Sequence, residues 1–401
     1  MKKPIFLAAL LCGCLTAASL YAKEGAGFTF DGGKLTVSPV VNMGVFWESN
    51  GNNSSHDEDA GAGYHIQPAI SFSYAAKRMS FGANTYYTFE RGFDSDNGQD
   101  SDSYGFSLSG RRELSRRWNL GISASYNHSE NDQFTERPSG IPGISFASLY
   151  KDESDNYALN ASLGYRSERW QFSFGAGWSR TETKGRNNWG SNDSNNYNVS
   201  ALVGRAIGPS TYWNVSGSMS FDKPSNGETS TSYALMTGIS GEVTNKTSYS
   251  AMVGVSFYDY SGNQDDTDFG PSYSVSIAHR FSRRITLSAA FDSRYESEQN
   301  ANPGDYYSWS HNLTAAMNFQ ISDPLSARLS STFSYEDHTA PAGGSYDRTY
   351  FQTAASLYYA FNSYVSLYTT ASWRTDIADG AGYRDDDRDD IRLDAGLSFR
   401  F

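Results

Sequence analysis

Apolar and polar residues alternate one by one through most of this chain. In the clearest segment, residues 170–178, the sequence reads W-Q-F-S-F-G-A-G-W: every second residue is Trp, Phe or Ala, and Gln, Ser or Gly stand between them. Successive side chains of an extended strand point to opposite faces. The pattern therefore predicts a β-strand with one apolar face and one polar face.

The same alternation recurs at short intervals along the sequence. Residues 118–126, 213–221, 285–291 and 365–373 each have an apolar face opposite one rich in Asn, Ser, Gly and Thr. The last ten residues, R-L-D-A-G-L-S-F-R-F, follow the same rule and end on Phe401. No segment shows the period of a helix, so the fold class predicted is all-β.

Short turn-forming links alternate with longer, acidic loops rich in Gly, Asn and Ser. The links recur about every 40 residues, the length of two strands with one loop and one turn. Counting hairpins from Lys34 to Phe401 predicts about eighteen strands, or sixteen if one weak pair is misread. A β-propeller has repeats of similar length, but this chain lacks the Gly-His and Trp-Asp dipeptides of its blades. The links are expected at residues 76–78, 115–117, 167–169, 208–210, 244–246, 282–284, 322–324 and 362–364.

The alternation suits a membrane, although the mean hydropathy of −0.57 looks soluble. Beyond residue 22 no apolar run approaches the roughly 18 residues of a membrane-spanning helix. A barrel, however, shows lipid only every second residue, so its mean hydropathy stays low. Trp170 and Trp178 would lie roughly 20 Å apart along the membrane normal, close to the spacing of two aromatic girdles. The sequence thus predicts a transmembrane antiparallel up-and-down β-barrel.

The N-terminal residues predict export from the cytoplasm. Residues 1–22 carry Lys2 and Lys3, an apolar run and a small-residue end, which together make a signal peptide cleaved before Lys23. Both cysteines of the chain lie in this segment, so the mature protein would have none. We expect residues 23–33 to form a short periplasmic segment and residues 34–401 to form the barrel.

Two links and the C-terminus resemble the porin-like outer-membrane β-barrel families of Gram-negative bacteria. The links read L-S-R-R-W at residues 114–118 and F-S-R-R-I at residues 281–285. The resemblance implies a location in the cell outer membrane, among its lipids and lipopolysaccharide. It also implies insertion by the barrel-assembly machinery, which would read a signal made of Leu397, Phe399 and Phe401.

The resemblance further implies a function, that of a porin through which small hydrophilic solutes and ions diffuse passively. It does not fix the direction of transport, because some relatives in this broad group sit in exopolysaccharide export clusters. A barrel component of exopolysaccharide export, or a structural barrel, is therefore the alternative. Assembly as a homotrimer is left open.

The interior of an eighteen-stranded barrel is too wide for side chains to fill, so a water-filled lumen is expected. Small polar residues such as Ser216, Ser218 and Ser330 dominate the inward parity. Charges there could face one another across the pore and contact solutes, or pair on neighbouring strands and stiffen the wall. The pore-lining candidates are Asp292, Arg294, Arg328, Glu336, Arg374, Asp376, Arg392 and Asp394.

Residues 127–155 are expected to form the longest loop, and it is unusually apolar. The third loop of porins commonly folds into the barrel, so the resemblance suggests a constriction here. Packing of this loop on the barrel rim or on a neighbouring protomer is an equal alternative. The constriction candidates are Ile141, Ile144, Phe146, Leu149 and Tyr150.

Catalytic and cofactor chemistry find little support in the sequence. His56, His128 and His338 are expected in loops, His65 inward, and His279 and His311 outward. No spacing specifies a Ser-His-acid arrangement. We expect no enzyme, no cofactor, no metal site and no nucleic-acid partner. The acidic loops are expected to be solvated, with cation gathering or divalent bridges to lipopolysaccharide as alternatives.

Overall fold

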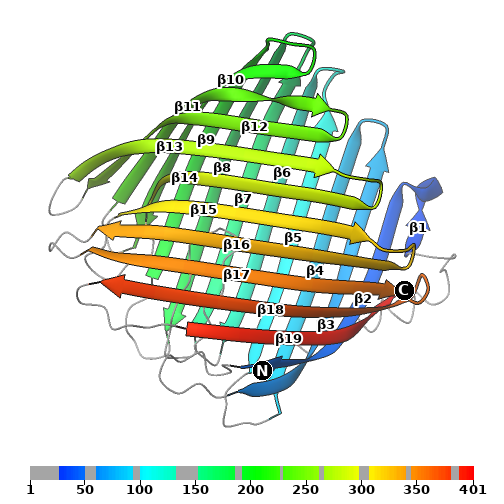
Figure 1. Cartoon of the computed structure of the whole chain (residues 1–401). Helices are drawn as coiled ribbons and strands as arrows, with labels where there is room; N and C mark the ends of the chain where they lie inside the picture. Colours follow the sequence, from blue (N-terminus) through cyan, green and yellow to red (C-terminus); the bar gives the residue numbers. More distant parts are fainter. Residues whose placement is uncertain are drawn as a thin grey trace.

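The computed structural model describes residues 27–49, 60–93, 100–131, 152–185, 192–225, 229–261, 266–297, 307–339, 345–380 and 388–401. Within these residues nearly all regular structure is β, as the alternation predicts (Figure 1). A short strand, β1 (Phe28–Phe30), and one helical turn, η1 (Asp31–Gly33), precede the long strands. In the part of the chain so described, no helix is long and apolar enough to cross a bilayer.

Eighteen long strands follow, each 13 to 16 residues in length. The first nine are β2 (Leu35–Glu48), β3 (Gly61–Ala76), β4 (Met79–Gly92), β5 (Ser101–Glu113), β6 (Trp118–Asn131), β7 (Asp152–Arg166), β8 (Trp170–Gly185), β9 (Asn192–Ala206) and β10 (Thr211–Pro224). The others are β11 (Thr229–Thr244), β12 (Thr247–Ser261), β13 (Asp266–Arg280), β14 (Ile285–Ser297), β15 (Tyr307–Gln320), β16 (Leu325–Thr339), β17 (Ser345–Ala360), β18 (Val365–Gly380) and β19 (Arg388–Arg400).

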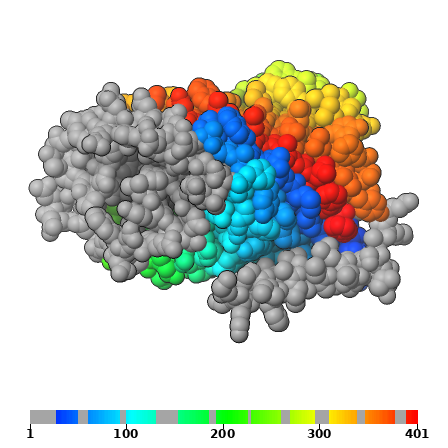
Figure 2. Space-filling model, turned by 90° about the horizontal axis from the view of Figure 1, so that it is seen from below, coloured from blue at the N-terminus to red at the C-terminus, as the bar shows by residue number. Residues whose placement is uncertain are grey.

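Each long strand pairs antiparallel with its neighbours in sequence, and β19 pairs with β2. The predicted eighteen-stranded barrel is therefore confirmed, and the sixteen-stranded alternative is wrong. Figure 2 shows this closure as the contact of the first strands, in blue, with the last strands, in red. In Figure 1, β10 to β19 cross the front of the barrel and β3 to β9 run steeply behind them, as tilted strands of a closed wall must.

The eight short links fall at one end of the barrel, where every predicted link is found, and the other connections between the long strands fall at the opposite end. In bacterial outer-membrane barrels the short turns face the periplasm. We call the two ends the turn end and the loop end. In the described chain, β1 pairs with the first residues of β2 at the turn end. Nearby on β2, the Pro39 carbonyl accepts a hydrogen bond from the backbone N–H of Phe401 at 3.0 Å.

The outer surface of the barrel is apolar. The large apolar side chains left exposed share the predicted outward parity: on β8, Trp170 is 46% exposed and Phe174 41%, and on β11, Leu235 is 57% exposed. A water-soluble protein would not leave so many such side chains uncovered in one continuous band. The exterior thus has the character of a lipid-facing surface.

The strands extend further toward the loop end than alternation alone predicts. Bilayer crossing needs only about 9 to 11 residues per strand, yet Asp102, His128 and Asp390 all lie inside strands. The expected loop at residues 127–155 is correspondingly shorter, because β6 reaches Asn131 and β7 begins at Asp152. Backbone ladders continue into water because they require hydrogen bonds and not apolar side chains.

The wall is sharply curved and partly split around β11 to β14. On its concave side, a Cβ at Gly238 or Gly254 would overlap the carbonyl oxygen of the adjacent strand. β13 pairs with β12 from Asp266 onward but with β14 only from Tyr273 onward. Pro271, which has no N–H to donate, stands just before the first rung of the β13–β14 ladder.

Candidate functional site

The inner wall of the barrel is polar and divides into two arcs. Along β7 to β12 it carries mostly hydroxyl and amide side chains that bond across strands. Asn214, for example, accepts a hydrogen bond from Gln171 Nε2 at 2.7 Å and donates one to Ser240 Oγ at 2.8 Å. Some polar side chains of the inner wall are covered by their neighbours. On β15, Asn312 is only 1% exposed and donates a hydrogen bond to Ser310 Oγ at 2.7 Å. The polar parity is confirmed, but part of this lining lies flat along the wall.

Charged residues gather on the other arc, at the loop end of β16 to β19 and β2 to β4. We call this set the charged arc. Its carboxylates outnumber its guanidinium groups by six to three, so the arc presents net negative charge to the lumen. Its members are Glu48, Glu90, Glu336, Arg348, Arg374, Asp376, Asp390, Arg392 and Asp394, which share the inward parity of their strands.

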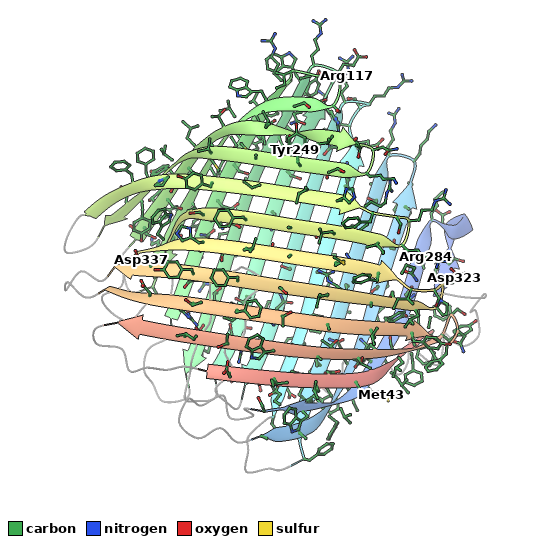
Figure 3. The ribbon with its side chains drawn as sticks, viewed as in Figure 1. Met43, Arg117, Tyr249, Arg284, Asp323 and Asp337 are labelled. Atoms are coloured by element: carbon green, nitrogen blue, oxygen red, sulfur yellow. The ribbon has the colours of Figure 1, made fainter. Side chains whose placement is uncertain are left out.

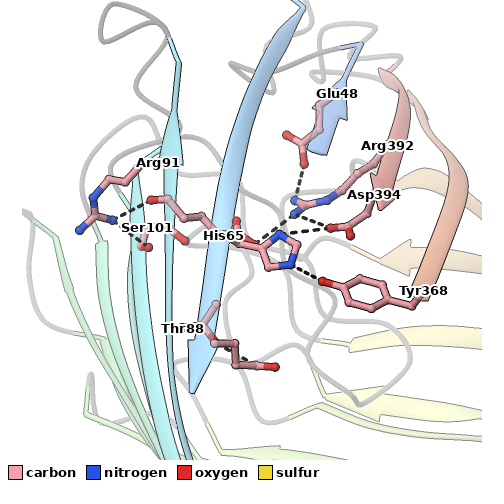
Figure 4. Close-up of polar contacts among 10 residues, drawn as sticks. Glu48, His65, Thr88, Arg91, Ser101, Tyr368, Arg392 and Asp394 are labelled. Carbon is pink, nitrogen blue, oxygen red and sulfur yellow. Dashed lines mark hydrogen bonds and ion pairs between the residues drawn. The ribbon is translucent and has the colours of Figure 1, made fainter. Parts of the chain in front are cut away.

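Arg392 on β19 is the centre of this arc (Figure 4). Its guanidinium contacts the Glu48 carboxylate on β2 and lies 3.1 Å from Glu90 Oε1 on β4 and 3.9 Å from Asp394 Oδ2. The same group stacks 4.6 Å from the ring centre of Phe46. One arginine thus joins three strands across the seam where the barrel closes.

A second chain of contacts runs from Asp394 through His65 to Tyr368 (Figure 4). His65 Nδ1 lies 3.5 Å from Asp394 Oδ2, and His65 Nε2 shares a hydrogen bond of 2.6 Å with the Tyr368 hydroxyl. The strands β19 and β2 stand between Tyr368 on β18 and His65 on β3, and each carries a glycine there. A Cβ at Gly44 would lie 2.9 Å from the Tyr368 hydroxyl oxygen, and one at Gly396 would lie closer still. The two glycines therefore make the space in which the tyrosine crosses the seam.

Two more ion pairs occupy the arc beside this network. Arg348 on β17 donates through Nε to Asp376 Oδ1 on β18 at 2.9 Å. Arg374 Nη2 lies 3.6 Å from Asp390 Oδ2 on β19. Glu336 on β16 stands opposite Arg348 in register and is only 5% exposed.

The structure brings together five of the eight pore-lining candidates: Glu336, Arg374, Asp376, Arg392 and Asp394. The other three are not members of the arc, although Arg294 stands on the same rung as Glu336, two strands away. Asp292 and Arg294 lie on β14, and Arg328 lies near the turn end of β16. Both signs of charge lie on adjacent strands of one arc, whereas charged rows that face one another across the pore and contact solutes stay a prediction. Pairing between neighbouring strands, the other reading, is what the described residues show.

Glu48, Glu90 and Tyr368 belong to the network but were not singled out from the sequence, and His65 was assigned its inward parity without a partner. Their inward parity could have been read from the alternation of their strands. The inward glycine pair Gly44 and Gly396 was the available signal for a large neighbouring side chain. What the sequence could not supply was the register that sets them side by side.

The remaining site candidates fall into two groups. All five constriction candidates, Ile141, Ile144, Phe146, Leu149 and Tyr150, lie outside the described residues. The proposed insertion signal is described: Leu397 pairs with Met43 and Phe399 with Val41 on β2, both in the outward row of β19. Phe401, at the turn end, is 44% exposed.

Two of the histidines expected in loops lie in strands. His338 is in β16. His128 is in β6 and not in a loop, and its Nδ1 lies 2.8 Å from Asp155 Oδ1 on β7. The Tyr126 hydroxyl donates to the same oxygen at 2.8 Å. In the part of the chain that the structure describes, no three His, Cys, Asp or Glu side chains are arranged to hold a metal ion.

Comparison with known proteins agrees with the fold. The chain matches a family model described as "Protein of unknown function, DUF481" over residues 151–361. No curated protein matches it. The FrpB iron transporter of Neisseria meningitidis, F5-1 variant, is 9% identical with a TM-score of 0.50, covering 91% of this chain and 82% of its own. A mutant of the ferric enterobactin receptor PfeA of Pseudomonas aeruginosa is 9% identical with a TM-score of 0.48, covering 94% and 81%.

At such low identity the likeness to solved structures concerns the fold alone. The location follows from the barrel itself. A closed antiparallel barrel with an even number of strands and an apolar outer band is the architecture of bacterial outer-membrane proteins, which places this chain in the cell outer membrane.

Proposed function

The chain belongs to the family described as "Protein of unknown function, DUF481", and we propose that it is an outer-membrane channel through which small hydrophilic solutes diffuse passively. The observation that carries the proposal is that the opposite sides of the barrel, β3–β8 and β11–β18, stand apart. Among the described residues, strands of the β3–β8 wall make no extensive contact with strands of the β11–β18 wall.

The expected dimensions support an aqueous lumen. Eighteen strands spaced about 4.8 Å apart and tilted about 40° give a circular barrel about 35 Å across between backbones. Inward side chains of the size of Ser and Asn cannot bridge that width. The polar inner face would keep the space wet, and the ion-paired charged arc would stiffen one side of it.

Conductance in planar bilayers tests the proposal directly. We expect purified protein to give steady, ohmic channels, and we expect liposomes that contain it to swell in sugars, amino acids and organic acids. A barrel that stays closed without partners would contradict passive diffusion and would favour the export alternative.

Cysteine labelling locates the conducting path. No cysteine occurs beyond residue 22, so Ser218→Cys adds one thiol to the inner face of β10 and Leu235→Cys adds one to the outer face of β11. A charged, water-soluble methanethiosulfonate should lower the conductance of the Ser218→Cys channel by a measurable step. Leu235→Cys is the matched control and should not respond; equal responses would contradict the assignment of the lumen.

A further inference from the structure

Positive charge is concentrated at the turn end of the barrel. The turn end holds sixteen of the 32 Lys and Arg residues of the chain but only five of its 44 Asp and Glu residues. Figure 3 shows Arg117 and Arg284 projecting from the short links there. The residues counted are those of 31–34, 77–80, 111–117, 166–169, 205–210, 242–247, 280–285, 321–328, 361–364 and 398–401.

Five of these basic side chains face the lumen. Each shares the parity of small polar inner-wall residues and follows or precedes an outward apolar neighbour, as Arg328 precedes the exposed Leu329. They lie on strands spread around the whole circumference, so they surround the turn-end mouth. We call them the mouth arginines: Arg111 on β5, Arg166 on β7, Arg280 on β13, Arg328 on β16 and Arg400 on β19.

The mouth arginines differ from the arginines of the charged arc in exposure and in pairing. All five are exposed, and in the described chain none lies within ion-pair distance of a carboxylate. Their described partners are neutral: Arg280 donates to the Asn245 carbonyl at 3.2 Å, and Arg166 stacks over the Tyr212 ring at 5.8 Å. Arg348, Arg374 and Arg392, by contrast, are all paired with acids.

Two carboxylates share the inward parity of the mouth, Glu113 on β5 and Glu242 on β11. They do not balance five guanidinium groups, and the arginines of the adjacent short links add further positive charge. A ring with a net excess of one charge, set in a low-dielectric wall, concentrates counter-ions at its opening. Guanidinium groups bind carboxylate and phosphate oxygens through paired N–H donors.

We infer that the turn-end mouth is a binding site for multivalent anions, and that phosphate- or carboxylate-bearing solutes are the class that this channel collects from the periplasm. The inference rests on the proposed function for its transport aspect alone, because anion binding does not require the lumen to conduct. Arg112 and Arg205, at the same end, face outward and would meet lipid headgroups instead.

A binding titration tests the site independently of conductance. Tripolyphosphate is titrated calorimetrically onto the full barrel in a zwitterionic detergent at 0.1 M salt. Replacing all five mouth arginines by Gln should raise the dissociation constant about tenfold or more. Arg112→Gln with Arg205→Gln is the control for loss of charge at the same end and should leave binding unchanged.

Two partial variants guard against a folding failure. Arg111→Gln with Arg166→Gln, and Arg280→Gln with Arg328→Gln and Arg400→Gln, should each weaken binding by an intermediate factor. Binding by the native barrel should also fall steeply between 0.1 and 1 M salt, since exposed charges are screened over about 3 Å at 1 M. Equal loss of binding in the outward control, or no loss in any mouth variant, would overturn the inference.

The transport aspect is tested in planar bilayers with the anion on one side at a time. Tripolyphosphate added on the turn side should reduce the current at a lower concentration than on the loop side. The variant with all five mouth arginines replaced by Gln should lose this asymmetry. Conductance without asymmetry would overturn the inference while leaving the channel intact. A barrel that binds the anion through the mouth arginines but never conducts would refute the proposed function and leave the anion site standing.

Discussion

At the scale of single residues, Arg392 shows how much depends on one side chain. It faces Glu48, Glu90 and Asp394 and is about one third exposed, so it is the main compensation for three partly buried carboxylates. Removing one partner of a buried ion pair leaves charge uncompensated, which costs more than the pair itself contributes.

We therefore expect Arg392→Met to lower the free energy of unfolding by roughly 2 to 4 kcal/mol, somewhat less than for a fully buried pair because solvent screens this site. Urea unfolding in detergent, followed by the shift in electrophoretic mobility between folded and unfolded barrel, measures the change. Arg328→Gln is the comparison, since this inward arginine has no carboxylate partner in the described chain, and it should change stability by less than about 0.5 kcal/mol. Equal effects of the two variants would contradict the compensating role of Arg392.

At the scale of strands, the curvature of β11 to β14 depends on residues without side chains. β11 and β12 approach so closely on their concave side that Gly254 faces the Leu235 carbonyl directly. Such an approach is open only to glycine, because any Cβ would displace backbone and not merely a flexible side chain. This glycine does not interrupt the alternation of apolar and polar residues in β12. The sharp curve of the wall at β11 to β14 could therefore not be read from the sequence pattern.

Gly254→Ala is accordingly expected to cost about 2 kcal/mol or more and to lower the yield of refolded barrel, because the wall must flatten or the ladder must shift. Gly217→Ala on β10, the strand on the other side of β11, is the matched control, since a Cβ there would have its nearest atom 3.9 Å away. Refolding into detergent, scored as the fraction of barrel with folded mobility, compares the two. If Gly217→Ala lowered the refolded fraction as much as Gly254→Ala, the close approach of β11 and β12 could not explain the effect.

At the scale of the whole molecule, the barrel has two surfaces of opposite character and two ends of opposite charge. The outer surface is apolar, and the inner surface carries hydroxyl, amide and ion-paired groups. The charged arc at the loop end has an excess of acids, whereas the turn end has an excess of bases. Both contrasts arise from the same alternation, which assigns each residue to one face, and from the position of each residue along its strand.

A lipid-facing surface and a wet lumen should respond differently to the same charge. Leu235→Arg places a cation on the outer face near the middle of β11 and should destabilise the barrel in lipid bilayers by about 2 to 4 kcal/mol. Ser218→Arg places it on the inner face of β10 and should cost much less, because water can solvate it there. Urea titration of both variants in liposomes decides the matter; similar costs at the two positions would mean that the faces are assigned wrongly.

The sequence by itself determined the fold class, the number of hairpins to within one, and the face to which each side chain points. These properties are local: a two-residue period survives in any single strand, and short links such as residues 115–117 mark the turns without reference to the rest of the chain. For the same reason Arg374, Asp376, Arg392 and Asp394 could be assigned to the inner face. Their strands could not be placed relative to β2, β3 and β4, which lie far away in sequence.

Tertiary structure alone decided which inner-wall residues meet. Closure of the barrel brings residue 392 beside residues 48 and 90, and register decides that Tyr368 finds two glycines and a histidine across the seam. It also decided how far the strands run beyond the membrane, because ladder hydrogen bonds persist where the hydrophobic pattern has ended. Pairing between distant strands depends on ring closure and register, which are properties of the assembled wall and leave no period in any one segment.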